Sequence, residues 1–197
     1  MSLTPTLPAL LESYFTQRLM AQRQASPHTI ASYRDTFRLL LNFAQKQSGK
    51  SPCSLNLTDL DAPLISKFLD ALEKQRGTSI SSRNVRLTAI RSFFRYAAYE
   101  EPAHSAHIQR VLAIQNKRQA HPMISFLIRE EIEALLAAPD QLTWYGRRDH
   151  ALLRLAVQTG LRLSEVTSLS REALVLGAGA HVQCHGKGRK TRCTPFD

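Results

Sequence analysis

Three charged side chains have the types and spacing to act on a phosphate ester. Arg162 directly follows a Thr-Gly-Leu helix stop within the segment 151–169, ALLRLAVQTGLRLSEVTSL. A guanidinium at the start of the next helix could bind two phosphate oxygens and stabilise charge that develops during group transfer. Glu165 follows on the same helical face and could orient Arg162. Lys187, between two glycines, could be a mobile cation and proton donor.

Each of these features also has a simpler interpretation. Arg162 and Glu165 could form a surface ion pair that contributes little to stability. The dipeptide Thr159-Gly160 could do no more than end a helix, and the lysine-rich segment around Lys187 could be a solvated turn. The order and spacing of the three features together favour the chemical interpretation.

Longer motifs carry a resemblance to a known family. TGLRLSEVTSL followed by HGKGRKTR resembles the first active-site box and the next β-hairpin of the tyrosine recombinase (phage-type integrase) family. FLIREEIEALLAAP at 126–139 resembles the start of that family's catalytic domain. SPHTIASYRDTFRLLLNFA at 26–44 and VRLTAIRSFFRYA at 85–97 are similar to its SAM-like, core-binding DNA-binding domain. The resemblance covers nearly the whole chain.

The resemblance implies a role for each chemical residue. Arg162 matches the first catalytic arginine, which binds the scissile phosphate, and Glu165 matches the acidic residue that supports the active site. Lys187 matches the hairpin lysine that protonates the leaving 5′ oxygen. In the family a tyrosine attacks the phosphate and forms a 3′-phosphotyrosyl link without ATP or metal. The implied activity is site-specific DNA recombination, as in integration or excision of a mobile element, with no cofactor.

The nucleophile is the main departure from the family pattern. In the family, a His-x-x-Arg box, a further His or Trp and the tyrosine follow the hairpin, whereas this sequence ends at Asp197. The tyrosines all precede Lys187 and match no nucleophile position: Tyr14, Tyr33, Tyr96, Tyr99 and Tyr145. We therefore expect a C-terminally truncated relative that binds DNA and is inactive in cleavage. A smaller departure is Ile128, where a Ser or Thr helix cap is expected.

Two alternatives to a recombinase remain open. The chain could be a non-catalytic DNA-binding protein, such as a directionality factor or a competitor of a full-length recombinase. It could also be a relic or an incomplete fragment. The segment 159–165 together with Lys187 favours a lineage that performed chemistry. The reading frame after codon 197 would separate these possibilities, since a His-x-x-Arg box and a tyrosine there would indicate a fragment.

The elements that must hold these residues begin with a helical N-terminal part. Apolar side chains at helical spacing predict four amphipathic helices over residues 1–101, which we assign as a SAM-like DNA-binding bundle. Ser26-Pro27 is predicted to open the second helix, Asp61 and Gly77 to bound the third, and the serines at 79–82 to open the fourth. The predicted apolar faces include Leu11, Tyr14, Phe15 and Leu19 in the first helix and Val85, Ile90, Phe93, Phe94 and Ala97 in the fourth.

A linker is expected at 102–123, with one short helix around 108–114. Residues 124–197 are then the first part of a mixed α/β catalytic domain. We predict helices at 130–138 and 147–158, the latter burying Ala151, Leu152, Leu155 and Ala156, and a short helix capped by Ser164. Runs at 181–185 and 191–195 predict a β-hairpin. The fold class is therefore mainly α, with a small β component.

Basic side chains in the N-terminal part predict contacts with DNA. Residues 1–118 hold 16 basic and 8 acidic side chains, a charge of +8, against +2 for residues 119–197. An excess of this kind suits a polyanion, because each cation that meets a phosphate releases condensed counterions. The candidate contacts, for each of which a solvated basic face is the alternative, are Arg34, Arg38, Arg83, Arg86, Arg91, Arg95, Lys117 and Arg118.

The remaining expectations concern location, metals and assembly. No apolar run approaches the roughly 20 residues that span a bilayer, so we expect a cytoplasmic, nucleoid-associated protein without membrane contact. No Cys/His spacing resembles a zinc site, and Cys184 and Cys193 are expected to face each other across the hairpin as free thiols. The family implies a tetramer on paired DNA sites. Exposed apolar surface and low stability are expected in residues 120–197.

Overall fold

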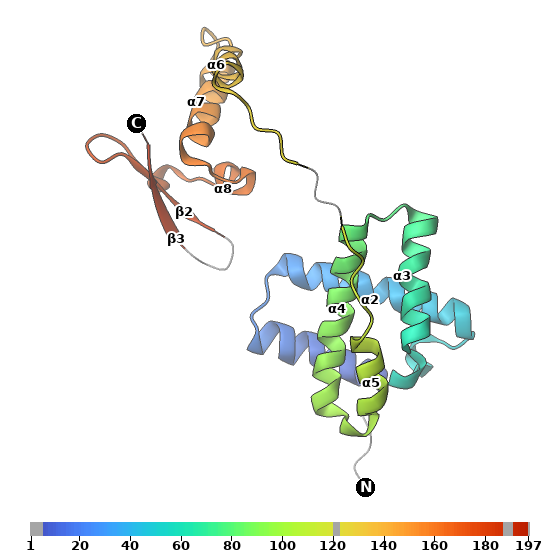
Figure 1. The fold of residues 1–197 in the computed structure, drawn as a ribbon. Helices are drawn as coiled ribbons and strands as arrows, with labels where there is room; N and C mark the ends of the chain where they lie inside the picture. Colours follow the sequence, from blue (N-terminus) through green and yellow to red (C-terminus); the bar gives the residue numbers. More distant parts are fainter. Residues whose placement is uncertain (1–5, 120–122, 187–190, 197) are drawn as a thin grey trace. The chain divides into compact units, whose positions relative to one another are not determined.

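The computed structural model describes residues 6–119, 123–186 and 191–196, and it divides the chain into two compact units (Figure 1). The first unit is Met1–His121 and the second is Pro122–Asp197. The first is helical, and the second combines helices with a small sheet. The predicted mainly α fold with a β-hairpin is confirmed.

The first unit is built around α4. Its α-helices are α1 (Leu7–Ser13), α2 (Pro27–Ser48), α3 (Ala62–Arg76), α4 (Ile80–Glu100) and α5 (Ser105–Leu112). Helix α4 contacts α1, α2, α3 and α5, and it contributes Leu87, Ile90, Phe93, Phe94 and Ala97 to the buried core. Val85, which was predicted on the same apolar face, is 49% exposed. That prediction was wrong because the buried stripe of α4 runs through Arg83, Leu87 and Ile90 at helical spacing, and Val85, two residues from Leu87, lies on the opposite side of the helix.

Side-chain caps begin α2, α3 and α4 of the first unit, and left-handed glycines end two of these helices. The Ser26 hydroxyl accepts the Thr29 N–H, and the Asp61 carboxylate accepts the Leu64 N–H at 2.8 Å. Ser79 caps α4 in the same way. At the other ends of α2 and α3, Gly49 and Gly77 have left-handed backbone conformations, with φ of 72° and 60°. The caps that the sequence predicts at Ser26, Asp61 and Gly77 are therefore confirmed.

The first predicted helix changes type along its length. It begins as α1 and continues as a π-helix, η1 (Tyr14–Gln22). Tyr14 and Leu19, five residues apart, are both fully buried. That separation is the i to i+5 hydrogen-bond spacing of a π-helix, so the wider helix directs both side chains into the core. In the core the Tyr14 ring packs edge-on against Phe93, with ring centroids 5.5 Å apart.

The segment that was expected to be a linker contains α5, which packs onto the first unit. Ile108 and Val111 of α5 are fully buried in its core. After α5 the chain runs along α4, where the Asn84 amide donates to the Lys117 carbonyl at 2.9 Å and accepts its N–H at 3.1 Å. Arg91 also donates to the Asn116 side chain. The chain is therefore attached to the first unit as far as residue 117.

The helices of the second unit are more exposed than the sequence predicts. They are α6 (Arg129–Ala137), α7 (Trp144–Thr159) and α8 (Leu163–Thr167). Of the α7 residues predicted to be buried, Ala151 and Leu152 are exposed, whereas Leu155 and Ala156 are half-buried. The prediction of full burial was wrong because the apolar face of α7 has few contacts among the described residues. The structure thus has the exposed apolar surface expected for this region.

Three antiparallel strands complete the second unit: β1 (Leu174–Val175), β2 (His181–His185) and β3 (Thr191–Pro195). Strands β2 and β3 confirm the predicted hairpin, and β1 was not predicted because two residues carry no periodic signal. The register pairs Cys184 with Arg192 and Gln183 with Cys193. The expectation that the two thiols face each other was wrong by one residue, which places them on opposite faces. Cys184 is buried and Cys193 is exposed.

Candidate active site

The turn between α7 and α8 positions the first candidate residue, Arg162. Gly160 ends α7 in a left-handed conformation, with φ of 60° and its N–H donating to the Ala156 carbonyl. Leu161 then enters the small core that Val182 and Cys184 form under the sheet. Arg162 follows with an extended backbone as the N-cap of α8. Ser164, which was predicted to cap this helix, lies inside it.

Glu165 takes over the capping role and holds Arg162 at two points. Its carboxylate Oε2 accepts the Arg162 backbone N–H at 2.8 Å, and Oε1 accepts Arg162 Nη1 at 3.1 Å. The Glu165 side chain is 4% exposed, whereas the Arg162 side chain is 65% exposed. The Arg162 guanidinium therefore donates through Nη1 to a buried carboxylate, and the rest of the group is exposed to solvent. The sequence-predicted pairing of these two residues is present in the structure.

The electrostatics keep Glu165 ionised. The pKa of Glu165 lies below its ordinary value, first because its carboxylate accepts the Arg162 backbone N–H and then because the Arg162 guanidinium donates to it. Burial acts in the opposite direction, and the positive charge of Arg192 adds to the lowering. A charged carboxylate under Arg162 is the condition for a fixed guanidinium.

Arg192 on β3 is a functional candidate that the sequence analysis missed. Its Nη2 donates to Glu165 Oε2 at 2.9 Å, and its Nε donates to Cys184 Sγ at 3.2 Å. The pKa of Arg192 is raised, first by the contact with Cys184 and then by the charge of Glu165. The motif HGKGRKTR contains Arg192, but only the strand register shows that it faces Cys184.

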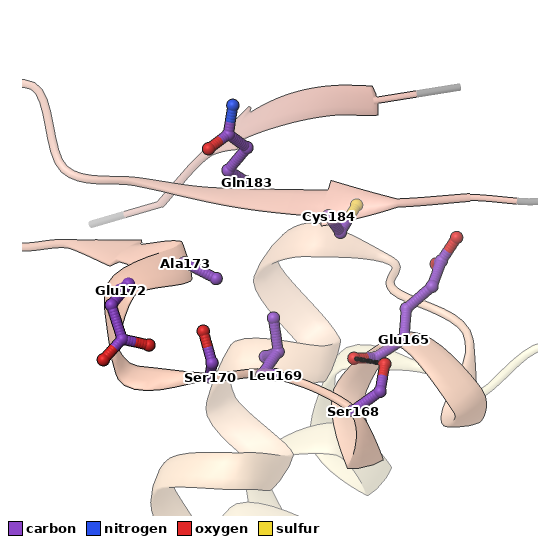
Figure 2. A pocket seen from close by; sticks show the side chains of 8 residues that line it. All are labelled: Glu165, Ser168, Leu169, Ser170, Glu172, Ala173, Gln183 and Cys184. Atoms are coloured by element: carbon purple, nitrogen blue, oxygen red, sulfur yellow. Dashed lines mark hydrogen bonds between the residues drawn. The ribbon is translucent and has the colours of Figure 1, made fainter. Parts of the chain in front are cut away.

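A cavity of about 250 Å³ lies beside this cluster, between α8 and the sheet. Figure 2 shows Glu165 from α8, Ser168 directly after that helix, and Cys184 from β2 on its wall. Glu172 lines it as well, so two carboxylates border the cavity. Their charge disfavours an anion there, and the exposed side of Arg162 is the better place for a phosphate. Lys187, the third predicted catalytic residue, lies outside the described residues.

The predicted DNA contacts of the first unit differ in exposure. Arg34, Arg38, Arg95, Lys117 and Arg118 are exposed, Arg86 and Arg91 are half-buried, and Arg83 is buried. The Arg83 side chain is only 6% exposed and lies 3.3 Å from a Glu73 carboxylate oxygen. It is therefore a buried ion pair within the bundle and not part of an exposed basic face.

Other predicted contacts are already paired within the protein. Arg38 and Arg86 both contact the Asp35 carboxylate, at 2.8 and 2.9 Å, and they hold the pKa of Asp35 below its ordinary value. Lys117 Nζ lies 2.6 Å from Glu73, and this hydrogen bond raises the Lys117 pKa. A phosphate would have to compete with these carboxylates at the three side chains. Arg34, Arg95 and Arg118 are left as exposed cations with no ion pair in the described part of the chain.

Neither a metal site nor a membrane span is found where the structure describes the chain. No group of three or more His, Cys, Asp or Glu side chains among the described residues could hold a metal ion. In the same residues, no helix combines the length and the apolar character needed to cross a bilayer.

Comparison with known proteins decides the family. The phage integrase N-terminal SAM-like domain matches residues 13–101, and the phage integrase family matches residues 125–197. The integrase/recombinase y4rD of Sinorhizobium fredii is 45% identical over 191 residues, which cover 96% of this chain and 68% of y4rD. The chain belongs to the phage integrase family of tyrosine recombinases. The predicted family and its SAM-like N-terminal part are confirmed.

Two further relatives are longer than this chain. The integrase/recombinase y4rC of Sinorhizobium fredii is 64% identical over 191 residues, covering 97% of this chain and 58% of y4rC. Tyrosine recombinase XerC of Pelobacter propionicus is 33% identical over 184 residues, covering 92% of this chain and 57% of XerC. This chain thus spans little more than half the length of these two relatives.

A solved structure supports the fold. The XerH site-specific recombinase, in a post-cleavage complex with palindromic difH substrate, matches 89% of this chain and 50% of the XerH chain. The TM-score is 0.62 and the sequence identity is 21%. At this identity the likeness establishes the fold, and the roles of individual residues rest on the geometry described above.

Proposed function

We propose that this chain supplies the DNA-holding and phosphate-binding parts of a site-specific tyrosine recombinase, which breaks and rejoins double-stranded DNA. The observation that carries the proposal is the arrangement of Arg162 on Glu165. The exposed Arg162 guanidinium donates to the buried Glu165 carboxylate through Nη1. The other N–H groups of the guanidinium stay available for an anion.

In the proposed reaction, Arg162 binds the non-bridging oxygens of the scissile phosphate. A guanidinium presents paired N–H donors that match two phosphate oxygens. Its charge stabilises the extra negative charge of the transition state when a tyrosine hydroxyl attacks the phosphorus. Lys187 would protonate the 5′ oxygen that leaves, so that the strand break produces a phosphotyrosyl link and a free 5′ hydroxyl.

The first unit is proposed to hold the duplex through sequence-independent phosphate contacts. Arg34, Arg95 and Arg118 are exposed cations in the part of the chain with a charge of +8. Arg38 and Lys117 would join them once phosphates replace their carboxylate partners. Two XerH site-specific recombinase structures are complexes with difH substrate, in pre-cleavage and post-cleavage forms, which supports duplex DNA as the partner here. A tetramer on paired sites is the proposed assembly for the complete recombinase.

A polypeptide of residues 1–197 is proposed to bind DNA without cleaving it. The covalent step needs a tyrosine hydroxyl at the phosphate, and the tyrosines of this sequence precede the hairpin. Tyr14 is fully buried in the first unit, and burial raises its pKa to about 12, so it is unsuited as a nucleophile. A duplex nicked near each candidate site would trap any phosphotyrosyl adduct. An adduct seen by denaturing gel electrophoresis would contradict this part of the proposal.

The phosphate-binding role is tested by the salt dependence of binding to a labelled duplex of mixed sequence. We expect log Kd to vary linearly with log salt concentration, and Arg162→Gln to reduce the slope by about 0.9, the contribution of one phosphate contact. Arg129→Gln is the matched control, because Arg129 is a highly exposed arginine of the same unit. Equal slopes for Arg162→Gln and Arg129→Gln would refute the role of Arg162.

A further inference from the structure

Arg192 is a second guanidinium on the buried carboxylate of Glu165, and the chemistry proposed above does not use it. Its Nη2 donates to Glu165 Oε2 at 2.9 Å while its Nε donates to the Cys184 thiol at 3.2 Å. Two contacts from one rigid, planar group fix the orientation of that group. Arg192 is therefore held at two points, one on α8 and one on β2.

The strand register explains how Arg192 reaches α8. Arg192 on β3 lies directly opposite Cys184 on β2. Side chains that are directly opposite in an antiparallel pair share one face of the sheet. Cys184 is buried on the face that packs with Leu161, at the turn before α8. Arg192 thus joins the turn end of the hairpin to α8, the helix whose N-cap is Arg162.

The oxygens of Glu165 are divided between the two arginines. Oε2 accepts both the Arg162 backbone N–H and Arg192 Nη2, whereas Oε1 accepts Arg162 Nη1. Rotation of the carboxylate about its last bond would break the contact with Arg192. Because Arg192 opposes this rotation, it also fixes the place of Oε1 and hence of the Arg162 guanidinium.

The second guanidinium also changes the charge of the cluster. One carboxylate and one arginine form a neutral pair, which attracts a phosphodiester only weakly. With Arg192 included, the cluster carries a net charge of +1 beside a side chain that is 4% exposed. The remaining positive charge favours an anion at Arg162, the more exposed of the two arginines.

We propose that Arg192 is a positioning residue for Arg162, which acts by fixing the Glu165 carboxylate and leaving the cluster positively charged. The inference rests on the proposed role of Arg162 as a phosphate ligand. Arg192 itself does not touch the phosphate.

A double-mutant cycle on DNA binding tests this. The variants are Arg162→Gln, Arg192→Gln and the double variant, with Arg129→Gln as the control for loss of one charge, and the probe is the labelled duplex of mixed sequence. We expect Arg192→Gln to weaken binding about three- to tenfold, within the coupling range of contacting residues, and to have no further effect once Arg162 is replaced. Additive losses would overturn the proposal, because they would mean that Arg192 contacts DNA itself.

A second experiment measures the pKa of the Glu165 carboxyl group directly and needs no DNA. The ¹³C chemical shift of the Glu165 carboxyl group, followed against pH, reports its pKa. We expect Arg192→Gln to raise that pKa towards the ordinary value, because a positive charge and a hydrogen-bond donor are lost. An unchanged Glu165 titration would overturn the positioning role. If Arg162→Gln leaves DNA binding unchanged while the Glu165 titration responds to Arg192, the proposed function fails and the positioning of Arg162 stands.

Arg192→Lys covers the case in which Arg192→Gln does not fold. Lysine keeps the charge but offers one nitrogen, which cannot bridge Glu165 and Cys184 as the guanidinium does. We expect DNA affinity between those of the unchanged protein and Arg162→Gln, with a folded amide NMR spectrum. An Arg192→Lys variant identical to the unchanged protein in affinity and Glu165 titration would refute the requirement for a two-point contact.

Discussion

At the scale of single residues, the cluster around Glu165 shows how a carboxylate is kept charged inside the protein. Burying an ion is unfavourable unless it is paired and hydrogen-bonded. Glu165 receives three N–H donors, from the Arg162 backbone and from the two guanidinium groups of Arg162 and Arg192. The cost of burying this carboxylate is thus offset by contacts that also fix the Arg162 guanidinium.

The lowered pKa of Glu165 predicts how the stability of the second unit depends on pH. In the unfolded chain this carboxyl group has its ordinary pKa of about 4.3, whereas in the folded chain its pKa is lower. The stabilisation is therefore fully present above the ordinary pKa and is lost as the pH falls through the folded-state pKa. Urea unfolding of the unit at a series of pH values should show this loss.

Glu165→Gln should flatten this acid dependence, because glutamine does not titrate. Glu133→Gln, which removes an exposed carboxylate on α6, is the matched control. Equal pH profiles for Glu165→Gln and the unchanged protein would show that the Glu165 pKa is not lowered in the folded state.

At the scale of elements, the helices begin in two ways. Ser26, Asp61 and Ser79 cap α2, α3 and α4 with their own side chains. The N-cap of α6 is instead Ile128, whose side chain has no acceptor for the free N–H groups of the first turn. Glu131 reaches back and accepts the Ile128 N–H at 2.9 Å, so only the Glu half of a capping box is present.

Ile128→Ser should therefore stabilise α6. Ile128 already has the extended backbone of an N-cap, with ψ of 167°, and its side chain is 59% exposed, so little apolar burial is lost. A serine there would complete the capping box and stabilise the second unit by about 1 kcal/mol. Urea unfolding measures the gain, and Ile124→Ser, at a 77% exposed position before the helix, is the control. A gain no larger than that of Ile124→Ser would contradict the capping argument.

At the scale of the whole molecule, the two units differ in the size of their cores. The first unit buries side chains from all of its α-helices, including the rings of Phe68, Phe93 and Phe94. The buried core of the second unit among the described residues is Leu161, Val182 and Cys184, and Phe126, Trp144 and Leu163 are more than half exposed. Since buried apolar area is the main source of stability, the second unit is expected to be the weaker one.

This difference predicts two unfolding transitions in urea. Trp144 is the single tryptophan and lies in α7, so its fluorescence reports the second unit. Far-UV circular dichroism is dominated by the long helices of the first unit. We expect the fluorescence midpoint at a lower urea concentration than the main circular dichroism midpoint. Coincident midpoints would mean that the chain unfolds as one cooperative unit.

Local patterns in the sequence were sufficient to predict most of the helices and strands. The caps at Ser26 and Asp61, the stop at Gly77 and the strands at 181–185 and 191–195 follow from interactions between residues near in sequence, which is why they could be predicted. The motif around Arg162 and Glu165 is local too, since one turn of helix brings the two side chains together. The sequence alone therefore determined the family, the helices and the pairing of Arg162 with Glu165.

Only the tertiary structure decided which distant residues meet. Arg83 is buried against Glu73 of another helix, and the register of β2 and β3 places Arg192, not Cys193, opposite Cys184. A shift of one residue in a strand pairing reverses the face of every side chain, and composition does not specify that shift. The contact of Arg192 with Glu165 depends on this register and on the packing of α8 under the sheet, so no spacing along the chain could have revealed it.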